Sequence, residues 1–290
     1  MLVSFGNVRA FRPVGGRSMT DAGRVPPAPA VLRLVQMAVL GRWRATGEEL
    51  YREVARLTEA APGRELLVSG SGDGVTAEWL AVRTGATVTG VDPEQQRVEA
   101  AEQRAREAFR GATLGYQAAP LEDLPFENAV FDATVGEPTL AALTEPGRAI
   151  AELSRVTKPL GVIVLLQPTW SSEIRGPARE MLVERLGLRP RMLVEWKQMM
   201  REAGIVELQV QDWTSGGPAR PSGTMKTIDT SELTWQQKAQ IVGRAWRRWG
   251  WREARTAVER ETTLLRELSR ERAIGFQLLK GVKWPHPKNA

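Results

Sequence analysis

The residues with the clearest potential for chemistry are three glycines at alternate positions, Gly70, Gly72 and Gly74, with Ser71 between the first two. They follow a short apolar run and precede a segment with helical periodicity, so we expect them in a strand-to-helix turn. Glycine allows a tight backbone turn and lets a ligand approach without meeting a Cβ atom. In open α/β sheets, ligands bind at such turns beside the carboxyl ends of the strands. The pattern therefore predicts a ligand-binding loop, with a plain turn as the alternative.

The spacing of the glycines argues against two phosphate-binding loops. A dinucleotide-binding loop would need its third glycine at position 75, where this chain has Val75. A P-loop would need Lys followed by Ser or Thr after its last glycine, and this pair does not follow Gly74. The observed G-x-G-x-G spacing suits a nucleoside sulfonium better than a pyrophosphate.

One carboxylate ends the second predicted strand. Asp92 lies 18 residues beyond Gly74 and is followed by Pro93. A carboxylate at this place can accept hydrogen bonds from both ribose hydroxyls of a nucleoside bound over the loop. Asp92 can also cap the next helix, with Pro93 in the first helical position. The two roles are compatible.

The inventory of reactive side chains is short. The chain has no cysteine and one histidine, His286, which excludes thiolate metal sites, cysteine nucleophiles and multi-histidine sites, and we expect no metal. Glu137 follows the fourth predicted strand, where it could position a hydroxyl or amine or remove its proton. The alternative for Glu137 is a solvent-facing loop residue.

Short apolar runs that alternate with helical stretches must position these residues. The runs predict a parallel sheet with helices on both faces, a Rossmann-like, doubly wound α/β fold. We expect residues 158–161 to form a turn that stops the preceding helix. The predicted strands are 65–69, 87–91, 113–118, 131–135, 162–166, 206–213 and 273–282, and the predicted core helices are 75–83, 94–110, 149–157 and 192–203.

The organisation along the chain follows from changes in composition. A Gly- and Pro-rich start predicts a flexible tail, a helical pattern with Tyr51 predicts an N-terminal cap, and a long Trp- and Arg-rich stretch predicts a helical insertion or lid before the last strand. We place the tail at 1–29, the cap at 30–62, the core at 63–214, the loop and insertion at 215–272, and the last strand and tail at 273–290.

The net charge of +6 is unevenly distributed. Residues 1–60 carry +4 and residues 231–290 carry +7, whereas the middle carries −5. The basic helices at 31–57 and 235–272 either pack on the core or contact an anionic partner or membrane surface. With no run of about 18 apolar residues and no signal-peptide pattern, we expect a cytoplasmic protein, with peripheral membrane contact as an alternative. We expect no DNA partner.

Six collinear segments together carry a family resemblance. They resemble class I S-adenosylmethionine-dependent methyltransferases, most closely the small-molecule branch that includes the ubiquinone-biosynthesis type. The resemblance covers about residues 45–283. It implies a seven-stranded sheet whose last strand is antiparallel, S-adenosyl-L-methionine as cofactor, and a small-molecule or lipid-like acceptor. The segments are ELLVSGSGDG (65–74), TGVDPE (89–94), LEDLPFENAVFDATV (121–135), ELSRVTKPLGVIVLL (152–166), WKQMMREAGIVELQV (196–210) and GFQLLKGVK (275–283).

The resemblance also implies roles for single residues. It places the glycine loop at the methionine and sugar, the Asp92 region at the ribose, and Glu137 at the acceptor; Tyr51 could also face the cofactor. The implied cofactor-binding residues are Gly70, Ser71, Gly72, Gly74, Asp92, Pro93, Leu121, Glu122 and Gly136.

The chain departs from the family at two positions. The family usually has an acidic residue two positions before the loop, which here is Val68, and often an Asp at the position of Pro120. These departures favour one alternative, a non-catalytic scaffold or binding subunit with the same fold. The basic ends favour another, a methyltransferase that acts on RNA.

Overall fold

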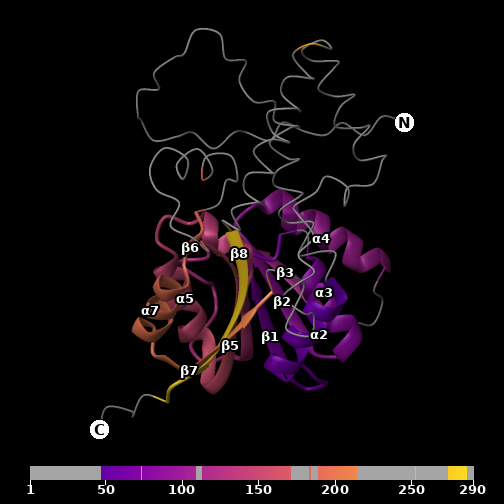
Figure 1. Cartoon of the computed structure of the whole chain (residues 1–290). Coiled ribbons are helices and arrows are strands. Elements are labelled where there is room, and N and C mark those ends of the chain that lie inside the picture. The colour runs from indigo at the N-terminus through magenta and orange to yellow at the C-terminus, as the bar shows by residue number, and fades with distance from the viewer. Residues whose placement is uncertain are drawn as a thin grey trace.

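The computed structural model describes residues 47–72, 74–108, 113–170, 189–213 and 274–285, together with Val183 and Arg252. Strands and helices alternate along the chain as predicted (Figure 1). The strands are β1 (Glu65–Ser69), β2 (Thr87–Asp92), β3 (Leu114–Ala118), β4 (Phe131–Gly136), β5 (Thr157–Trp170), β6 (Arg191–Met192), β7 (Ile205–Asp212) and β8 (Ile274–Lys283). The helices are α2 (Gly47–Thr58), α3 (Val75–Thr84), α4 (Gln95–Ala108), the 3₁₀ helix η1 (Pro138–Ala142), α5 (Pro146–Val156) and α7 (Leu193–Glu202).

The strands form one sheet in the order β3-β2-β1-β4-β5-β8-β7. β1 to β5 are parallel, and β8 runs antiparallel between β5 and β7, which confirms the predicted Rossmann-like fold and its antiparallel last strand. The sheet has eight strands rather than seven because β6 adds two residues beside the end of β5. Two residues are too short to produce a periodic sequence pattern.

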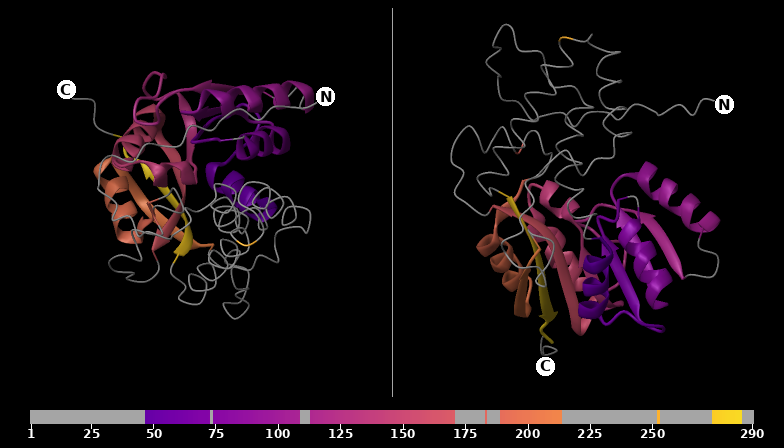
Figure 2. Two further views of the ribbon diagram at one scale, coloured as in Figure 1. Left: turned by 90° about the horizontal axis from the view of Figure 1, so that it is seen from above. Right: turned by 45° about the vertical axis from the view of Figure 1, so that its right-hand side comes forward.

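Helices cover both faces of the sheet (Figure 2). Alternation along the strands explains this arrangement, since successive side chains of a strand point to opposite faces. Leu66 and Val68 of β1 belong to the apolar cluster that includes α2, α3 and α4, whereas Leu67 belongs to the cluster that includes α5 and α7. The sheet is therefore buried on both sides, as its continuous apolar strands predict.

The start of β5 differs from the prediction. Residues 158–161 were expected to form a turn, but β5 begins at Thr157 directly after α5 and extends through Trp170. A register irregularity opposite Phe131 and Ala133 and a left-handed residue, Leu160 (φ 63°), absorb the change from helix to strand. A Cβ atom at Gly161 would lie 2.7 Å from the Asp132 carbonyl oxygen and 2.8 Å from that of Lys158, so glycine is needed there for close packing of the backbone.

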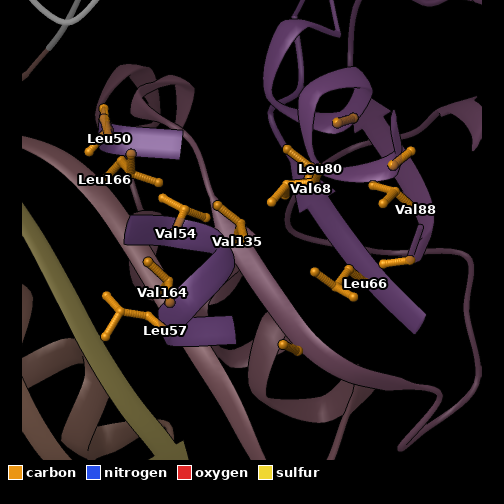
Figure 3. Packing of buried hydrophobic residues seen from close by; sticks show 14 of the residues in the cluster. Leu50, Val54, Leu57, Leu66, Val68, Leu80, Val88, Val135, Val164 and Leu166 are labelled. Carbon is orange, nitrogen blue, oxygen red and sulfur yellow. The ribbon is translucent and has the colours of Figure 1, made fainter. Parts of the chain in front are cut away.

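The helix before β1 packs on the sheet. Leu50, Val54 and Leu57 of α2 are buried in the same cluster as residues of β4 and β5, such as Val135 and Val164 (Figure 3). The apolar face of α2 is therefore occupied by the core, whereas the cap as a whole stays a prediction. None of the helices in the described part is long and apolar enough to cross a membrane.

Several predicted segments lie outside the described residues. They are the tail at 1–29, positions 30–46 of the predicted cap, His286, and the predicted insertion at 215–272 except for Arg252.

Candidate functional site

The glycine loop follows β1, at the point where the strand order of the sheet reverses. β1 is flanked by β2 and β4, and Ser69 at its end pairs with Gly136 at the end of β4. The amides of Gly70 and Ser71 donate to the carbonyl of Val91 (2.7 and 2.9 Å), and the amide of Glu137 donates to the carbonyl of Ser69 (2.9 Å). The loop is thus attached to both neighbouring strands at the topological switch point, where doubly wound sheets bind their ligands.

The three glycines of the loop all have left-handed backbones, with φ of 75°, 52° and 79° for Gly70, Gly72 and Gly74. They differ in their surroundings. A Cβ atom at Gly70 would lie 2.7 Å from Cβ of Thr139, whereas one at Gly72 would meet, among the described residues, the Arg97 guanidinium at 3.7 Å. Gly70 is therefore fixed by packing as well as by its conformation, while the described residues pack less closely around Gly72.

Asp92 joins the second strand to this loop. Its side chain is almost fully buried; Oδ2 accepts the amide of Gly72 (2.8 Å), and Oδ1 accepts the amide of Glu94 (3.0 Å). α4 begins at Gln95, so the prediction that Asp92 is its N-cap and Pro93 its first residue is wrong. Asp92 instead closes the turn before the helix. A carboxylate has about four acceptor positions, so two remain for hydroxyl donors.

Glu137 lies beside the loop with its carboxyl group largely out of solvent. The residue is half-buried, and Oε1 is buried without a hydrogen-bond partner among the described residues. Burial raises the pKa of Glu137 to about 7, although an interaction with the Thr76 side chain acts in the opposite direction. The solvent-facing alternative for this residue is therefore wrong.

The peptide that carries Glu137 is held by a buried amide. Gln167 of β5 donates its Nε2 to the carbonyls of Gly136 (3.1 Å) and Glu137 (2.9 Å). A Cβ atom at Gly136 would lie 2.7 Å from Leu165 and 3.2 Å from Leu153, so packing against the α5 side of the sheet explains this glycine. Its predicted contact with the cofactor stays a prediction.

The segment after β3 contains the other two predicted residues. Leu121 is buried and Glu122 half-buried. The loop that follows is held by Arg155 of α5, whose guanidinium donates to the carbonyls of Leu124 (2.9 Å) and Phe126 (2.8 Å). The sequence placed Arg155 inside a family motif but did not indicate this role.

Two tyrosines lie near the loop and the first helices of the core. Tyr116 of β3 was not singled out, yet it is buried and its hydroxyl donates to the carbonyl of Gly74 (3.1 Å). The ring of Tyr51 lies against Trp79 of α3, with 5.8 Å between ring centroids, and its place near the cofactor stays a prediction. A polar aromatic in a short, weakly patterned strand leaves little signal in a sequence.

The polar groups at this edge fit a polar ligand. The hydroxyls of Ser69 and Ser71, like Oε1 of Glu137, are buried and have no hydrogen-bond partner among the described residues. Buried polar atoms normally have partners, so such a group of unsatisfied atoms is typical of a ligand site. The two positions at which the family has acidic residues hold Val68, in the apolar core, and Pro120, which is exposed. Neither side chain is acidic. No group of three or more metal-ligating side chains occurs within the described ranges.

Comparisons with known proteins agree with this geometry. A family model described as a methyltransferase domain matches residues 67–165. A 2-phytyl-1,4-naphtoquinone methyltransferase of Nostoc is 36% identical over 41% of this chain and 54% of its own length. A ubiquinone/menaquinone biosynthesis C-methyltransferase of Geotalea daltonii is 27% identical over 47% of this chain and 55% of its own length. The chain thus spans little more than half of these relatives.

Solved structures agree on the fold. A geranyl diphosphate C-methyltransferase from Streptomyces coelicolor, in complex with Mg²⁺, geranyl-S-thiolodiphosphate and S-adenosyl-L-homocysteine, superposes with a TM-score of 0.60 at 16% identity. The match covers 81% of this chain and 76% of that one. At this identity the likeness establishes the fold alone. Together with the family model and the relatives, it confirms the resemblance to class I methyltransferases that the motifs indicated.

Proposed function

We propose that this chain, whose residues 67–165 belong to the methyltransferase domain family, transfers a methyl group from S-adenosyl-L-methionine to a small-molecule acceptor. One observation carries the proposal: a left-handed glycine loop is joined to a buried carboxylate, Asp92, at the topological switch point of the sheet. The hydroxyls of Ser69 and Ser71 at the same edge, which are buried without a partner from the described segments, support it.

The proposed cofactor contacts follow the edge of the sheet. The loop from Gly70 to Gly74 lies against the methionine and sugar, and the described residues leave the Gly72 backbone less closely packed than that of Gly70. Asp92 accepts the ribose hydroxyls with the acceptor positions that its two backbone amides leave free. Leu121 offers an apolar surface to the adenine and Glu122 lies beside it. The cofactor itself supplies a methyl group that is already activated by its sulfonium.

The proposed role of Glu137 concerns the acceptor. Methyl transfer requires close approach and alignment above all, so a general base is needed only when the accepting atom carries a proton. Glu137 has a raised pKa, and its buried Oε1 has no hydrogen-bond partner in the described part of the chain. It can therefore hold a hydroxyl or amine of the acceptor and take its proton near neutral pH.

The first experiment is calorimetric titration of the purified protein with S-adenosylmethionine and S-adenosylhomocysteine. We expect micromolar binding by the wild type and at least tenfold weaker binding by Asp92→Asn, because charge-assisted hydrogen bonds to hydroxyls are lost. Asp132→Asn is the matched control, because Asp132 also accepts a backbone amide, that of Glu65 (2.9 Å), at the amino end of β4. No wild-type binding at millimolar ligand would contradict the proposal.

A second experiment identifies the acceptor class. The named activities of the relatives make reduced quinones and naphthoquinones the first molecules to test, with transfer of a radiolabelled methyl group as readout. Cofactor binding without transfer to any acceptor would favour the binding-only alternative, which the absence of acids at Val68 and Pro120 suggests. Transfer to RNA that falls steeply with salt would favour the RNA-directed alternative.

A further inference from the structure

The backbone of each glycine in the loop forms a hydrogen bond with a side chain from a different element. The Thr139 hydroxyl, in η1 after β4, donates to the carbonyl of Gly70 (3.1 Å). Asp92 at the end of β2 accepts the amide of Gly72 (2.8 Å). The hydroxyl of Tyr116, in β3, donates to the carbonyl of Gly74 (3.1 Å). Three side chains thus define the shape of the loop before any ligand arrives.

The ring of Tyr116 fills a slot that exists because Gly74 and Gly90 have no Cβ atoms. Tyr116 pairs directly with Gly90 of β2, and a Cβ atom at Gly90 would lie 2.5 Å from its ring. A Cβ atom at Gly74 would overlap its hydroxyl. The ring therefore lies between β2 and the loop, and neither glycine can be replaced without displacing it. This placement brings the hydroxyl to the carbonyl of Gly74 and also near the carboxylate of Glu78, with which it interacts.

The carbonyl of Gly74 has two donors. It accepts the amide of Glu78 (2.9 Å), which is the first helical hydrogen bond of α3, and the hydroxyl of Tyr116. Burial raises the pKa of Tyr116 further above its usual value, so the hydroxyl stays protonated and remains a donor throughout the accessible pH range. Tyr116 thereby fixes the direction of the peptide at which the loop ends and α3 begins.

We propose that Tyr116 is a positioning residue for the cofactor loop: its hydroxyl orients the Gly74 peptide and so raises cofactor affinity. The inference rests on the proposed function, since the loop must hold S-adenosylmethionine for its shape to matter. A loop that already has its bound shape loses less conformational freedom when the ligand binds. The hydroxyl should therefore affect cofactor binding and leave turnover at saturating cofactor unchanged.

The test is Tyr116→Phe, which keeps the ring in its slot and removes one hydrogen bond. We expect the dissociation constant for S-adenosylhomocysteine, measured by calorimetry, to rise about three- to tenfold. The KM for S-adenosylmethionine should rise similarly, with kcat unchanged. Ser154→Ala in α5 is the control, because it removes another buried hydroxyl-to-carbonyl bond, to Ala203 (2.7 Å), away from the loop. It should lower the melting temperature but leave cofactor affinity unchanged.

The outcomes separate this inference from the proposed function. Wild-type binding together with equal affinity in Tyr116→Phe would overturn the inference alone, because the hydroxyl would then serve stability only. Absence of binding in the wild type would overturn the proposed function and the inference with it. Should Tyr116→Phe fail to fold, Gly90→Ala displaces the ring while keeping the hydroxyl. Wild-type affinity in Gly90→Ala would likewise overturn the inference.

Discussion

At the scale of single residues, two buried carboxyl groups in different environments define the candidate site. Asp92 accepts two backbone amides, which satisfy its charge, whereas Glu137 has an oxygen without a partner among the described residues. A satisfied carboxylate is suited to a constant binding role. A desolvated carboxyl group with a pKa of about 7 is suited to exchanging a proton. The same kind of side chain can thus serve binding in one place and proton transfer in another.

The raised pKa of Glu137 predicts how stability depends on pH. The folded-state pKa of about 7 exceeds the ordinary value of 4.5, so between these values the folded state binds more protons than the unfolded state. Stability from this residue is therefore present below about pH 4.5 and is lost as the pH rises to about 7. We compare the free energy of unfolding of Glu137→Gln with that of the wild type. The difference, variant minus wild type, should be larger at pH 8 than at pH 5.

Urea denaturation at both pH values measures this difference. Glu122→Gln, a half-buried glutamate on the neighbouring loop, is the control. Equal effects of Glu137→Gln at the two pH values would show that the carboxyl group ionises normally in the folded protein.

At the scale of elements, a clamp of hydrogen bonds from Arg155 of α5 holds the loop after β3, which forms part of the site. Arg155 of α5 bonds to Glu152 in the same helix through two nitrogens and to the carbonyls of Leu124 and Phe126 in the loop after β3. Glu152 in turn accepts the amide of Leu124 (2.8 Å). A helix on one face of the sheet therefore positions the segment that leads from Leu121 to β4.

Replacement of this clamp should destabilise the protein. In Arg155→Lys the charge remains, but an ammonium group cannot reach the same set of acceptors as a planar guanidinium. We expect a loss of about 1–3 kcal/mol in the free energy of unfolding, because partly buried carbonyls lose their donors. Arg56→Lys is the control, since Arg56 also pairs with a glutamate three residues earlier but is exposed. Equal stability of both variants in urea denaturation would contradict the clamp.

At the scale of the whole molecule, a single sheet brings distant segments to one edge. The loop after β1, Asp92 at the end of β2 and Glu137 after β4 come together because parallel strands end on the same side. The binding edge therefore exists only when the sheet is intact. Cofactor binding and global stability should be linked.

The linkage predicts a thermal shift. At a concentration of S-adenosylhomocysteine about 100 times its dissociation constant, the folded state should gain about 2.7 kcal/mol. For a domain of this size, this gain corresponds to a rise in melting temperature of several degrees. Differential scanning fluorimetry measures it, and Asp92→Asn should show a smaller rise at the same concentration. A rise of equal size with adenine alone would mean that the edge does not recognise the rest of the cofactor.

Much of this arrangement was determined by the sequence alone. Apolar runs of β1, β4 and β5 specify strands through their continuous hydrophobicity, and the glycines at 70, 72 and 74 specify the turn through the φ values they permit. The position of Asp92 after β2 placed a carboxylate beside that turn. These are local properties, and local chemistry is sufficient to predict them.

The tertiary structure alone decided what each polar group faces. The buried state of Glu137, the slot of Tyr116 between Gly74 and Gly90, and the contacts of Arg155 join residues that are dozens of positions apart. Strand pairing and side-chain packing bring such residues together, and neither leaves a periodic signal in the chain. Gly136 shows the difference most simply: in the sequence it is a glycine beside a binding edge, and in the structure Leu165 and Leu153 leave no room for a side chain.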